Sequence, residues 1–533
     1  MSSIPAHFAR GLALLGSMLA VACGPVDSAW AQYRRADDLM TGSLAASLGL
    51  QIEWTQTLAT PYGVQSLVDI RLEKDATAQQ RFLEIVADQG AENERVLTRI
   101  RLPELLVPEA AGKQATPDRE EDEIRRIASN DIRRLKRRGI TATIREIKQP
   151  RMWIYAIAND GTLERRDAET GKLDWRARVG DRRLGYGPLG VGNSSVVVTN
   201  GGNIIQVRAE TGIIRERLSL RRAELFGASV AGDYVIVHTV GGNFEAYPRR
   251  DIMLDPYTEH VQGSALSPPV QAPTSSLTCW TTSSEHCYVM ESQGTPSVLF
   301  RLETDGIAPG GAAAASGDRF FLGCNAGMVY GIRATRTGDV MWSQAIGVPF
   351  EERPIIVGDR VLIRSVFGTL HCLNAANGDR LWDQPVRGVG EIHTAVEDDL
   401  YVTTAAGLMA VIDVNTGRAR PLAKRFRPTQ ILNNTLTNRL YLVGTSGAIQ
   451  CLRPTDSPLI KWKLDSQTVP DGLADEAAQS ELAPADAAAG VQAPADDAGG
   501  NVMDDLFGGG GGADDDPFGG MGGDDNPFGG SPF

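Results

Sequence analysis

The segments Phe320–Trp342 (FFLGCNAGMVYGIRATRTGDVMW) and Val361–Trp382 (VLIRSVFGTLHCLNAANGDRLW) share one internal order. Each begins with a short apolar run, reaches a glycine (Gly327 or Gly368), and continues into a second apolar run. A second glycine and then a tryptophan follow in both segments. Short apolar runs that are separated by glycine turns predict antiparallel strands joined by tight hairpins.

This order recurs along most of the chain. The first glycines of the eight repeats are Gly161, Gly202, Gly242, Gly294, Gly327, Gly368, Gly407 and Gly447, with successive separations of 41, 40, 52, 33, 41, 39 and 40 residues. The second glycines are Gly171, Gly212, Gly338, Gly378 and Gly417. The tryptophans that follow them are Trp175, Trp342 and Trp382, and we interpret Trp462 as a later equivalent. One repeat is therefore three or four antiparallel strands of about five residues each.

A sheet of this size cannot bury both of its faces by itself. Repeats spread over Met152–Leu464 bury them by stacking around a common axis, which predicts an all-β propeller. The third repeat lacks its second glycine and its tryptophan, and the fourth is degraded, so the blade number is seven or eight, and we take eight. We expect each outer-strand tryptophan to fill the space that opens between neighbouring blades toward the rim.

The pattern AxDxxTGxxxW, preceded by a DG hairpin, resembles the PQQ-like (quinoprotein-type) repeat. The best matches are Arg166-DAETGKLDW, Arg333-ATRTGDVMW and Leu373-NAANGDRLW. The resemblance covers residues 49–464, and among families with this repeat the chain looks most like the BamB-type envelope propellers. In that family an N-terminal strand with a tryptophan closes the ring, and Trp54 would be that residue.

The BamB resemblance implies a non-enzymatic protein of the cell envelope. Its partners would be envelope proteins, with the β-barrel outer-membrane insertase as the partner that the family suggests. Its activity would be to assist the assembly of outer-membrane proteins. We expect a monomer whose loops and edge strands bind partners on a rigid scaffold.

The N-terminal residues read as an export signal. Residues 1–31 contain the apolar run Gly11–Cys23 and end in the small-x-small pattern Ala29-Trp30-Ala31, which predicts a cleaved signal peptide. A second interpretation is lipidation of Cys23 in a lipobox-like stretch, in which the usual leucine stands one place early. Residues 32–48 are assigned to a linker. We expect an exported protein, periplasmic or attached to the outer membrane, peripherally or by a lipid anchor.

An insertion, residues 77–148, interrupts the first blade between the predicted strands Ser66–Leu72 and Met152–Ile157. It contains a helix at about 117–138, since capping residues and acids begin this segment, and a basic run and Gly139 end it. Two interpretations stay open: a solvated helix packed on the rim of the propeller, or a basic docking patch for an anionic partner.

The acidity of the chain belongs to its C-terminal tail. Residues 465–533 contain fifteen acidic residues and no Lys or Arg, so the net charge of −13 becomes +2 for the residues before the tail. A near-neutral folded part argues against nucleic-acid binding. We expect disorder in this Asp/Gly/Ala/Phe-rich tail, because it has too few apolar residues to form a core. The tail is either a solubilising segment or, through its spaced phenylalanines, the partner-binding element of a secreted scaffold.

Motifs for chemistry are missing from the sequence. It has no CxxC, HExxH, GxSxG or P-loop pattern, so we predict no catalytic, cofactor-binding or metal-binding residue. Cys279 and Cys287 stand eight residues apart in a strand–turn–strand segment, where a hairpin disulfide is geometrically possible. A PQQ-dependent dehydrogenase with PQQ and Ca²⁺ stays an alternative. It is the less favoured one, because the adjacent cysteine pair that often clamps PQQ in that family is missing.

Overall fold

The computed structural model describes residues 38–87, 95–102, 119–273, 275–315, 318–335, 338–420, 422, 425–457 and 459–463. The predicted signal peptide, the lipidation candidate Cys23 and the acidic tail lie outside these residues. Within them, no helix is both long enough and apolar enough to cross a membrane.

The strands of the described residues form eight antiparallel sheets. The first sheet contains β2 (Leu67–Ala87), β4 (Ala142–Ala158), β5 (Thr162–Asp167) and β6 (Leu173–Arg178), with β3 (Arg95–Arg101) beside β2; the second contains β7 (Gly190–Val191), β8 (Ser195–Asn200), β9 (Asn203–Arg208) and β10 (Ile214–Ser219); and the third contains β11 (Glu224–Ala231), β12 (Tyr234–Thr239), β13 (Asn243–Pro248) and β14 (Tyr257–His260). The fourth sheet contains β15 (Val270–Gln271), β16 (Leu277–Thr281), β17 (His286–Glu291) and β18 (Ser297–Glu303); the fifth contains β19 (Ala313–Ala314), β20 (Arg319–Gly323), β21 (Met328–Arg333) and β22 (Asp339–Ala345); and the sixth contains β23 (Ile355–Val357), β24 (Arg360–Arg364), β25 (Thr369–Asn374) and β26 (Val386–Arg387). The seventh sheet contains β27 (Val389–Val396), β28 (Asp399–Thr404), β29 (Met409–Asp413) and β30 (Ala419–Arg420), and the last contains β31 (Gln430–Ile431), β32 (Leu440–Val443), β33 (Ala448–Pro454) and β1 (Leu50–Thr57).

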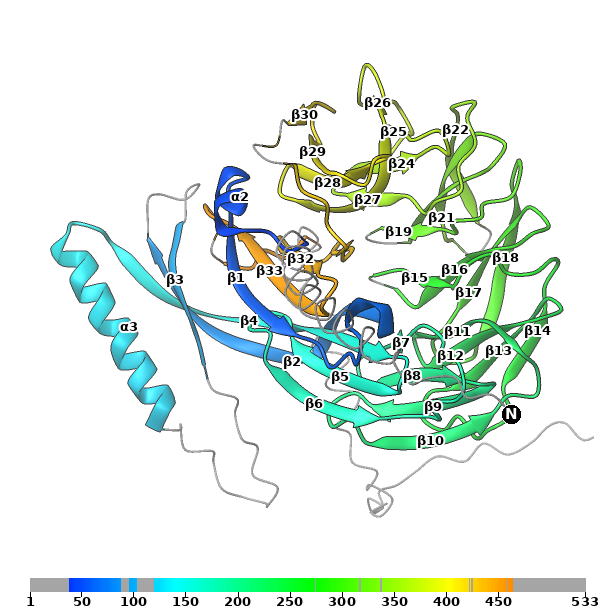
Figure 1. Ribbon diagram of the computed structural model, residues 1–533, viewed down its shortest axis with the longest axis horizontal. Helices are drawn as coiled ribbons and strands as arrows, with labels where there is room; N and C mark the ends of the chain where they lie inside the picture. The colour runs from blue at the N-terminus through cyan, green and yellow to red at the C-terminus, as the bar shows by residue number, and fades with distance from the viewer. Residues whose placement is uncertain are drawn as a thin grey trace, which may run out of the picture. The chain divides into compact units, whose positions relative to one another are not determined.

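The sheets follow one another around a common centre, as a β-propeller (Figure 1). Short first strands such as β7, β15 and β19 lie near the centre, and fourth strands such as β10, β14 and β18 lie outside. The second strands are buried on both faces; all six residues of β8, for example, are buried. This pattern is the one expected for a sheet that is covered on each side by another sheet.

Separate apolar cores lie between neighbouring sheets. Phe320 and Leu322 of the fifth sheet pack with Cys287 and Val289 of the fourth, and comparable clusters join each sheet to the next around the ring. No sheet therefore leaves an apolar face in water, which is the physical reason for closing the ring.

The ring closes between the two ends of the described chain. β1 pairs antiparallel with β33, with Trp54 opposite Cys451, and so becomes the outer strand of the last sheet. This is the place that the family resemblance gives to the strand with Trp54. Closure in this way means that opening the ring requires the loss of a complete strand pairing.

The packed domain begins earlier than the predicted boundary at residue 49. The segment assigned to a linker contains α2 (Gly42–Ser47), whose first turn is capped by the Thr41 hydroxyl, which accepts from the Leu44 amide at 3.4 Å. Leu44 is buried against the last two sheets, and the Met40 amide donates to Oε1 of Gln450 at 3.0 Å. The apolar residues of this short segment are too few to predict a helix, and only the neighbouring sheets stabilise it.

The fourth repeat has a different register from the one assigned by its glycine. Gly294 lies in the loop between β17 and β18, whereas the hairpin between β16 and β17 has Glu285 at φ 59°. Glu285 stands where the other repeats have a glycine. When Glu285 takes the place of Gly294 in the series of turn positions, the separations of 52 and 33 residues become nearly equal. The sequence pattern missed it because a non-glycine residue rarely adopts a positive φ.

The insertion grows out of the first sheet without a break. β2 and β4 run through both parts and pair along their length, with register shifts between Leu67 and Asp69 and between Asp75 and Gln79. β3 pairs with the far end of β2. α3 (Arg119–Arg137), within the predicted range, packs Ala128 and its apolar neighbours against Leu83 and Ile85. The helix stands away from the ring beside this extended hairpin (Figure 1).

Candidate functional site

Most of the predicted repeat residues lie where a side chain of one sheet packs on a turn of the next sheet, and we call these contacts joints. A Cβ added at Gly212 would lie 2.6 Å from the Trp175 ring, and Gly378 and Gly417 have the same relation to Trp342 and Trp382. In each joint the indole Nε1 donates to the carbonyl three residues before the glycine: Trp175 to Ala209 at 2.8 Å, Trp342 to Ala375 at 3.1 Å and Trp382 to Val414 at 3.0 Å. The tryptophan ring thus packs on the turn of the next sheet and also donates a hydrogen bond to it.

Trp54 makes the joint that closes the ring, in a modified form. Its ring would lie 2.6 Å from a Cβ at Gly171, but its Nε1 has no hydrogen-bond partner among the described residues. The corresponding carbonyl, that of Ala168, accepts instead from the Tyr441 hydroxyl at 3.1 Å. The closing joint therefore uses two aromatic side chains for the two roles that one tryptophan has elsewhere.

Two joints that lack a tryptophan use other side chains. Phe300 packs on Gly338, with 2.4 Å between its ring and an added Cβ. Glu216 stands on the outer strand of the second sheet and accepts from the Ile252 amide at 2.9 Å, at a turn without glycine. Sequence reasoning missed both residues, because it looked for a tryptophan at these positions.

Trp462 does not belong to these joints. It forms an isolated bridge with Thr437, and Nζ of Lys74 lies 5.5 Å from its ring centroid. The interpretation of Trp462 as a repeat equivalent is therefore not what the structure shows, since β1 with Trp54 already occupies the outer strand of the last sheet. Trp462 instead packs at the edge of the apolar core between the last and the first sheet.

The remaining repeat glycines stand in the turns where they were predicted. Gly161, Gly327, Gly368, Gly407 and Gly447 all have positive φ angles, between 71° and 88°. At Gly447 an added Cβ would meet the Thr60 hydroxyl at 2.2 Å, so this turn also approaches the segment after β1 closely. These residues shape the ring and offer no chemistry of their own.

Cys279 and Cys287 lie together, as their spacing suggested, but with free thiols. Their sulfurs are 3.2 Å apart, and both side chains are buried on neighbouring strands. The contact with Cys287 and burial raise the pKa of the Cys279 thiol, so it is protonated and unreactive at neutral pH. The disulfide between them stays a prediction. Cys324, Cys372 and Cys451 are buried and free.

Metal-binding chemistry finds no support in the described part of the chain. There, no three His, Cys, Asp or Glu side chains gather in a way that could hold a metal ion. His238 and His393 are buried, and burial lowers the pKa of each to about 4. These histidines are neutral at physiological pH and pack in the sheets.

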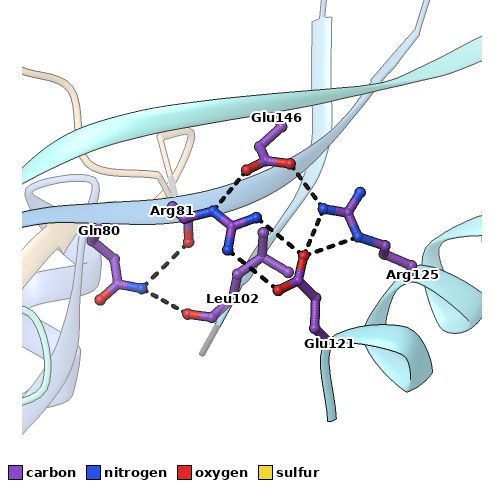
Figure 2. Close-up of polar contacts among 6 residues, drawn as sticks. All are labelled: Gln80, Arg81, Leu102, Glu121, Arg125 and Glu146. Atoms are coloured by element: carbon purple, nitrogen blue, oxygen red, sulfur yellow. Dashed lines mark hydrogen bonds and ion pairs between the residues drawn. The ribbon is translucent and has the colours of Figure 1, made fainter. Parts of the chain in front are cut away.

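The insertion is held by a network of charged side chains between α3 and its sheet (Figure 2). Glu121 of α3 accepts from Arg81 of β2 at 3.0 Å and from Arg125 at 2.7 Å, and Glu146 of β4 accepts from Arg81 at 2.8 Å and from Arg125 at 2.9 Å. The hydrogen bonds from Arg81 and Arg125 lower the pKa of Glu121. The charges of the two carboxylates and the two guanidinium groups thus neutralise one another near the start of α3.

The opposite face of the inserted sheet is fixed to the ring. Glu84 accepts from Arg99 at 2.6 Å and from Arg145 at 3.0 Å. Arg99 also donates to the Ile460 carbonyl at 3.3 Å, which joins the insertion to the last segment of the described chain. The insertion is therefore a supported arm with one outward-facing helix.

The outward surface of this arm is basic at one end. Arg133, Lys136, Arg137 and Arg138 are exposed, and they have no ion-pair partner among the described residues. Ile127, 46% exposed, lies on the same helix. Cations beside an exposed apolar side chain are suited to an acidic partner with apolar groups. We define this surface, residues 126–138 of α3 and the turn after it, as the arm surface.

The family that matches the chain is described as outer membrane protein assembly factor BamB, and the match covers residues 159–420 and 325–470. Together these stretches make up more than half of the chain. The chain belongs to the BamB family.

Solved structures similar to this BamB-family chain have low sequence identity to it. BamB from Moraxella catarrhalis is 18% identical, covers 56% of this chain and 91% of its own, and has a TM-score of 0.45. The computationally designed Ika8 protein (15% identity, 56% and 92% coverage, TM-score 0.42) and Sqt1 of Saccharomyces cerevisiae (10% identity, 56% and 92%, 0.42) are also similar. No curated protein matches the chain by sequence.

The insertion lies outside the part of the chain that matches the BamB family. The match begins at residue 159, after the end of β4, whereas the arm surface is at residues 126–138. The ring joints, by contrast, fall inside the match from Gly161 onward. The arm is thus the ordered element in which this chain adds most to the repeat architecture.

Proposed function

We propose that this BamB-family chain is a non-enzymatic envelope protein that binds other envelope proteins and assists outer-membrane protein assembly. The family match over residues 159–470 is the observation that carries the proposal. The joints support it physically: they give a rigid ring on which loops and edge strands bind a partner with little loss of conformational freedom. The β-barrel outer-membrane insertase is the partner that this proposal names.

The arm surface is the part of the chain that we assign to partner contact. It is held at a defined place by the Glu121 network and by Arg99, and its four exposed cations are free to pair with acidic groups of a partner. Placement on a supported element keeps the entropic cost of binding low. Exposed charges of this kind mainly raise the rate of association and fix orientation.

Crosslinking in the native envelope, followed by mass spectrometry, tests the proposal. The wild-type chain is expected to capture an outer-membrane barrel protein, and a variant with Arg133→Glu and Arg137→Glu is expected to capture several-fold less. Arg182→Glu with Arg183→Glu is the control of equal charge change on the ring, since these side chains are also exposed and have no ion-pair partner among the described residues. Capture of envelope barrels by none of the proteins would overturn the proposal.

A second measurement separates binding from catalysis. PQQ and Ca²⁺ added to the purified chain are expected to give no cofactor-dependent dye reduction with alcohols or sugars. Turnover that depends on PQQ would replace the binding proposal with the dehydrogenase alternative. Fractionation of cells, with and without Cys23→Ala, tests export and attachment to the outer membrane, and light scattering tests the expected monomer.

A further inference from the structure

The centre of the ring contains a cavity of about 890 Å³ lined by residues of several sheets. Three of its lining residues are arginines: Arg71 of β2, Arg249 after β13, and Arg353 before β23. Uncharged polar residues, including Gln271 of β15, make up much of the remaining wall. A cavity of this volume has room for a small molecule of many atoms.

Arg353 lacks a carboxylate partner. Its Nε donates to the Gly310 carbonyl and its Nη2 to the Pro268 carbonyl, both at 3.3 Å, and it forms no ion pair among the described residues. Its side chain is exposed, and its guanidinium is positively charged at neutral pH. Arg353 therefore has N–H donors that are accessible to an anion in the cavity.

The other two arginines leave this charge uncompensated. Arg71 pairs with Asp69 at 2.8 Å, but its side chain is still 47% exposed to the cavity side. Arg249 forms no ion pair with the described residues, and its Nη1 lies close to the backbone of Gly192 at the cavity wall. Three guanidinium groups with free donors therefore line one space.

The three arginines outnumber the two acids, Glu73 and Asp233, that line the cavity. Burial raises the pKa of Glu73 to about 7, so it is about half protonated at neutral pH, and Asp233 accepts from the Gly294 amide at 3.1 Å. Beyond Arg353, a second cavity of about 370 Å³ contains Glu352 and Glu391. Glu352 is ion-paired with Arg364, and burial raises the pKa of Glu391.

We propose that the central cavity binds a small molecule with phosphate or carboxylate groups, held by Arg353, Arg71 and Arg249. Guanidinium groups recognise such oxyanions by paired N–H donors, and three of them in one cavity can contact different oxygens of one ligand. The ring would then have a ligand at its centre that is separate from partner contact on the arm surface. This inference rests on the cavity alone and stands whether or not the proposed function holds.

Calorimetric titration of the whole protein at low ionic strength tests the site, with citrate and inorganic pyrophosphate as the two probes. At least one probe is expected to bind with Kd below about 1 mM, and binding is expected to weaken as NaCl is added. Binding of citrate alone identifies a carboxylate ligand, and binding of pyrophosphate alone identifies a phosphate ligand. Both results support the site.

Arg353→Gln is expected to weaken binding by about tenfold or more, because it removes one of the three cations that line the cavity. Arg249→Gln, at the cavity wall, provides a second variant in case Arg353→Gln fails to fold. Arg221→Gln is the control, since this arginine is fully accessible on the outside, with its side chain 89% exposed. The site is disproved if neither probe binds the wild type at about 10 mM, or if both cavity variants bind as tightly as the control.

Discussion

The substitution Gly378→Ala tests the joints between the sheets, and the chain provides a matched control for it. Gly378 has φ +77° and faces the Trp342 ring, with 2.6 Å between an added Cβ and Cε3 of the ring. Gly388, ten residues later, has φ +79°, and an added Cβ there meets no atom within 4 Å. The two substitutions therefore share the backbone strain and differ in the contact with Trp342.

The expected magnitudes follow from this geometry. An L-residue in the left-handed region costs about 1–2 kcal/mol, which applies to both variants. Non-bonded carbons normally sit about 3.5–4.0 Å apart, so Gly378→Ala also forces an overlap with the indole. Overpacking of this kind costs about 1–3 kcal/mol, and displacement of the ring loses the hydrogen bond to Ala375, about 1 kcal/mol more. We expect Gly378→Ala to be less stable than Gly388→Ala by about 2–4 kcal/mol.

Urea unfolding, followed by tryptophan fluorescence and far-UV circular dichroism, measures this difference. A double-mutant cycle with Trp342→Ala separates the two causes, because Gly378→Ala in that background should cost only the backbone strain. Equal unfolding midpoints for the two alanine variants would refute the close contact. A coupling energy of zero in the cycle would refute the assignment of the extra cost to Trp342.

Three further predictions address the closure of the ring, the arm and the sheet interior. Trp54→Ala is expected to lower the free energy of unfolding by about 3–5 kcal/mol, more than Trp462→Ala, because Trp54 is buried in the closing joint and Trp462 is only half-buried; urea unfolding that ranks them in the opposite order would contradict the closure. Glu121→Gln is expected to speed hydrogen exchange in α3, because it removes the carboxylate that pairs with both Arg81 and Arg125. The expected loss of local stability is about 1–3 kcal/mol, which is limited by the partial exposure of Arg125 to solvent. Because the pKa of Glu121 is lowered in the fold, its stabilisation is present above its ordinary value of 4.5 and is lost as the pH falls through the lower folded value. The α3 exchange of wild type and variant should therefore differ at neutral pH and converge at acid pH, and equal exchange at neutral pH would count against the network. His238, whose pKa burial lowers to about 4, binds a proton more readily in the unfolded chain, so stability should fall by up to about 3 kcal/mol as the pH falls from 6.5 to 4; His238→Leu should flatten this dependence in urea unfolding at several pH values, whereas the surface variant His260→Leu should not.

The sequence by itself determines the strands, their turns and the repeat. Glycines such as Gly368 and Gly378 act locally, because the positive φ of a turn depends on the residue at that position. The apolar runs between these glycines are removed from water only when one sheet packs on another, so the pattern predicts the propeller. The place of the strand with Trp54 followed from a resemblance to a family, not from local pattern, since its partner strand lies at the other end of the described chain.

Tertiary structure alone decides which residues complete the ring and which charges meet at its centre. Phe300 and Glu216 replace tryptophan in two joints, Glu285 replaces a turn glycine, and α2 becomes ordered only against the last two sheets. Arg71, Arg249 and Arg353 come from three different sheets, and no spacing in the sequence relates them. Their meeting depends on closure of the whole ring, because contacts between distant segments arise from packing and not from local backbone preference.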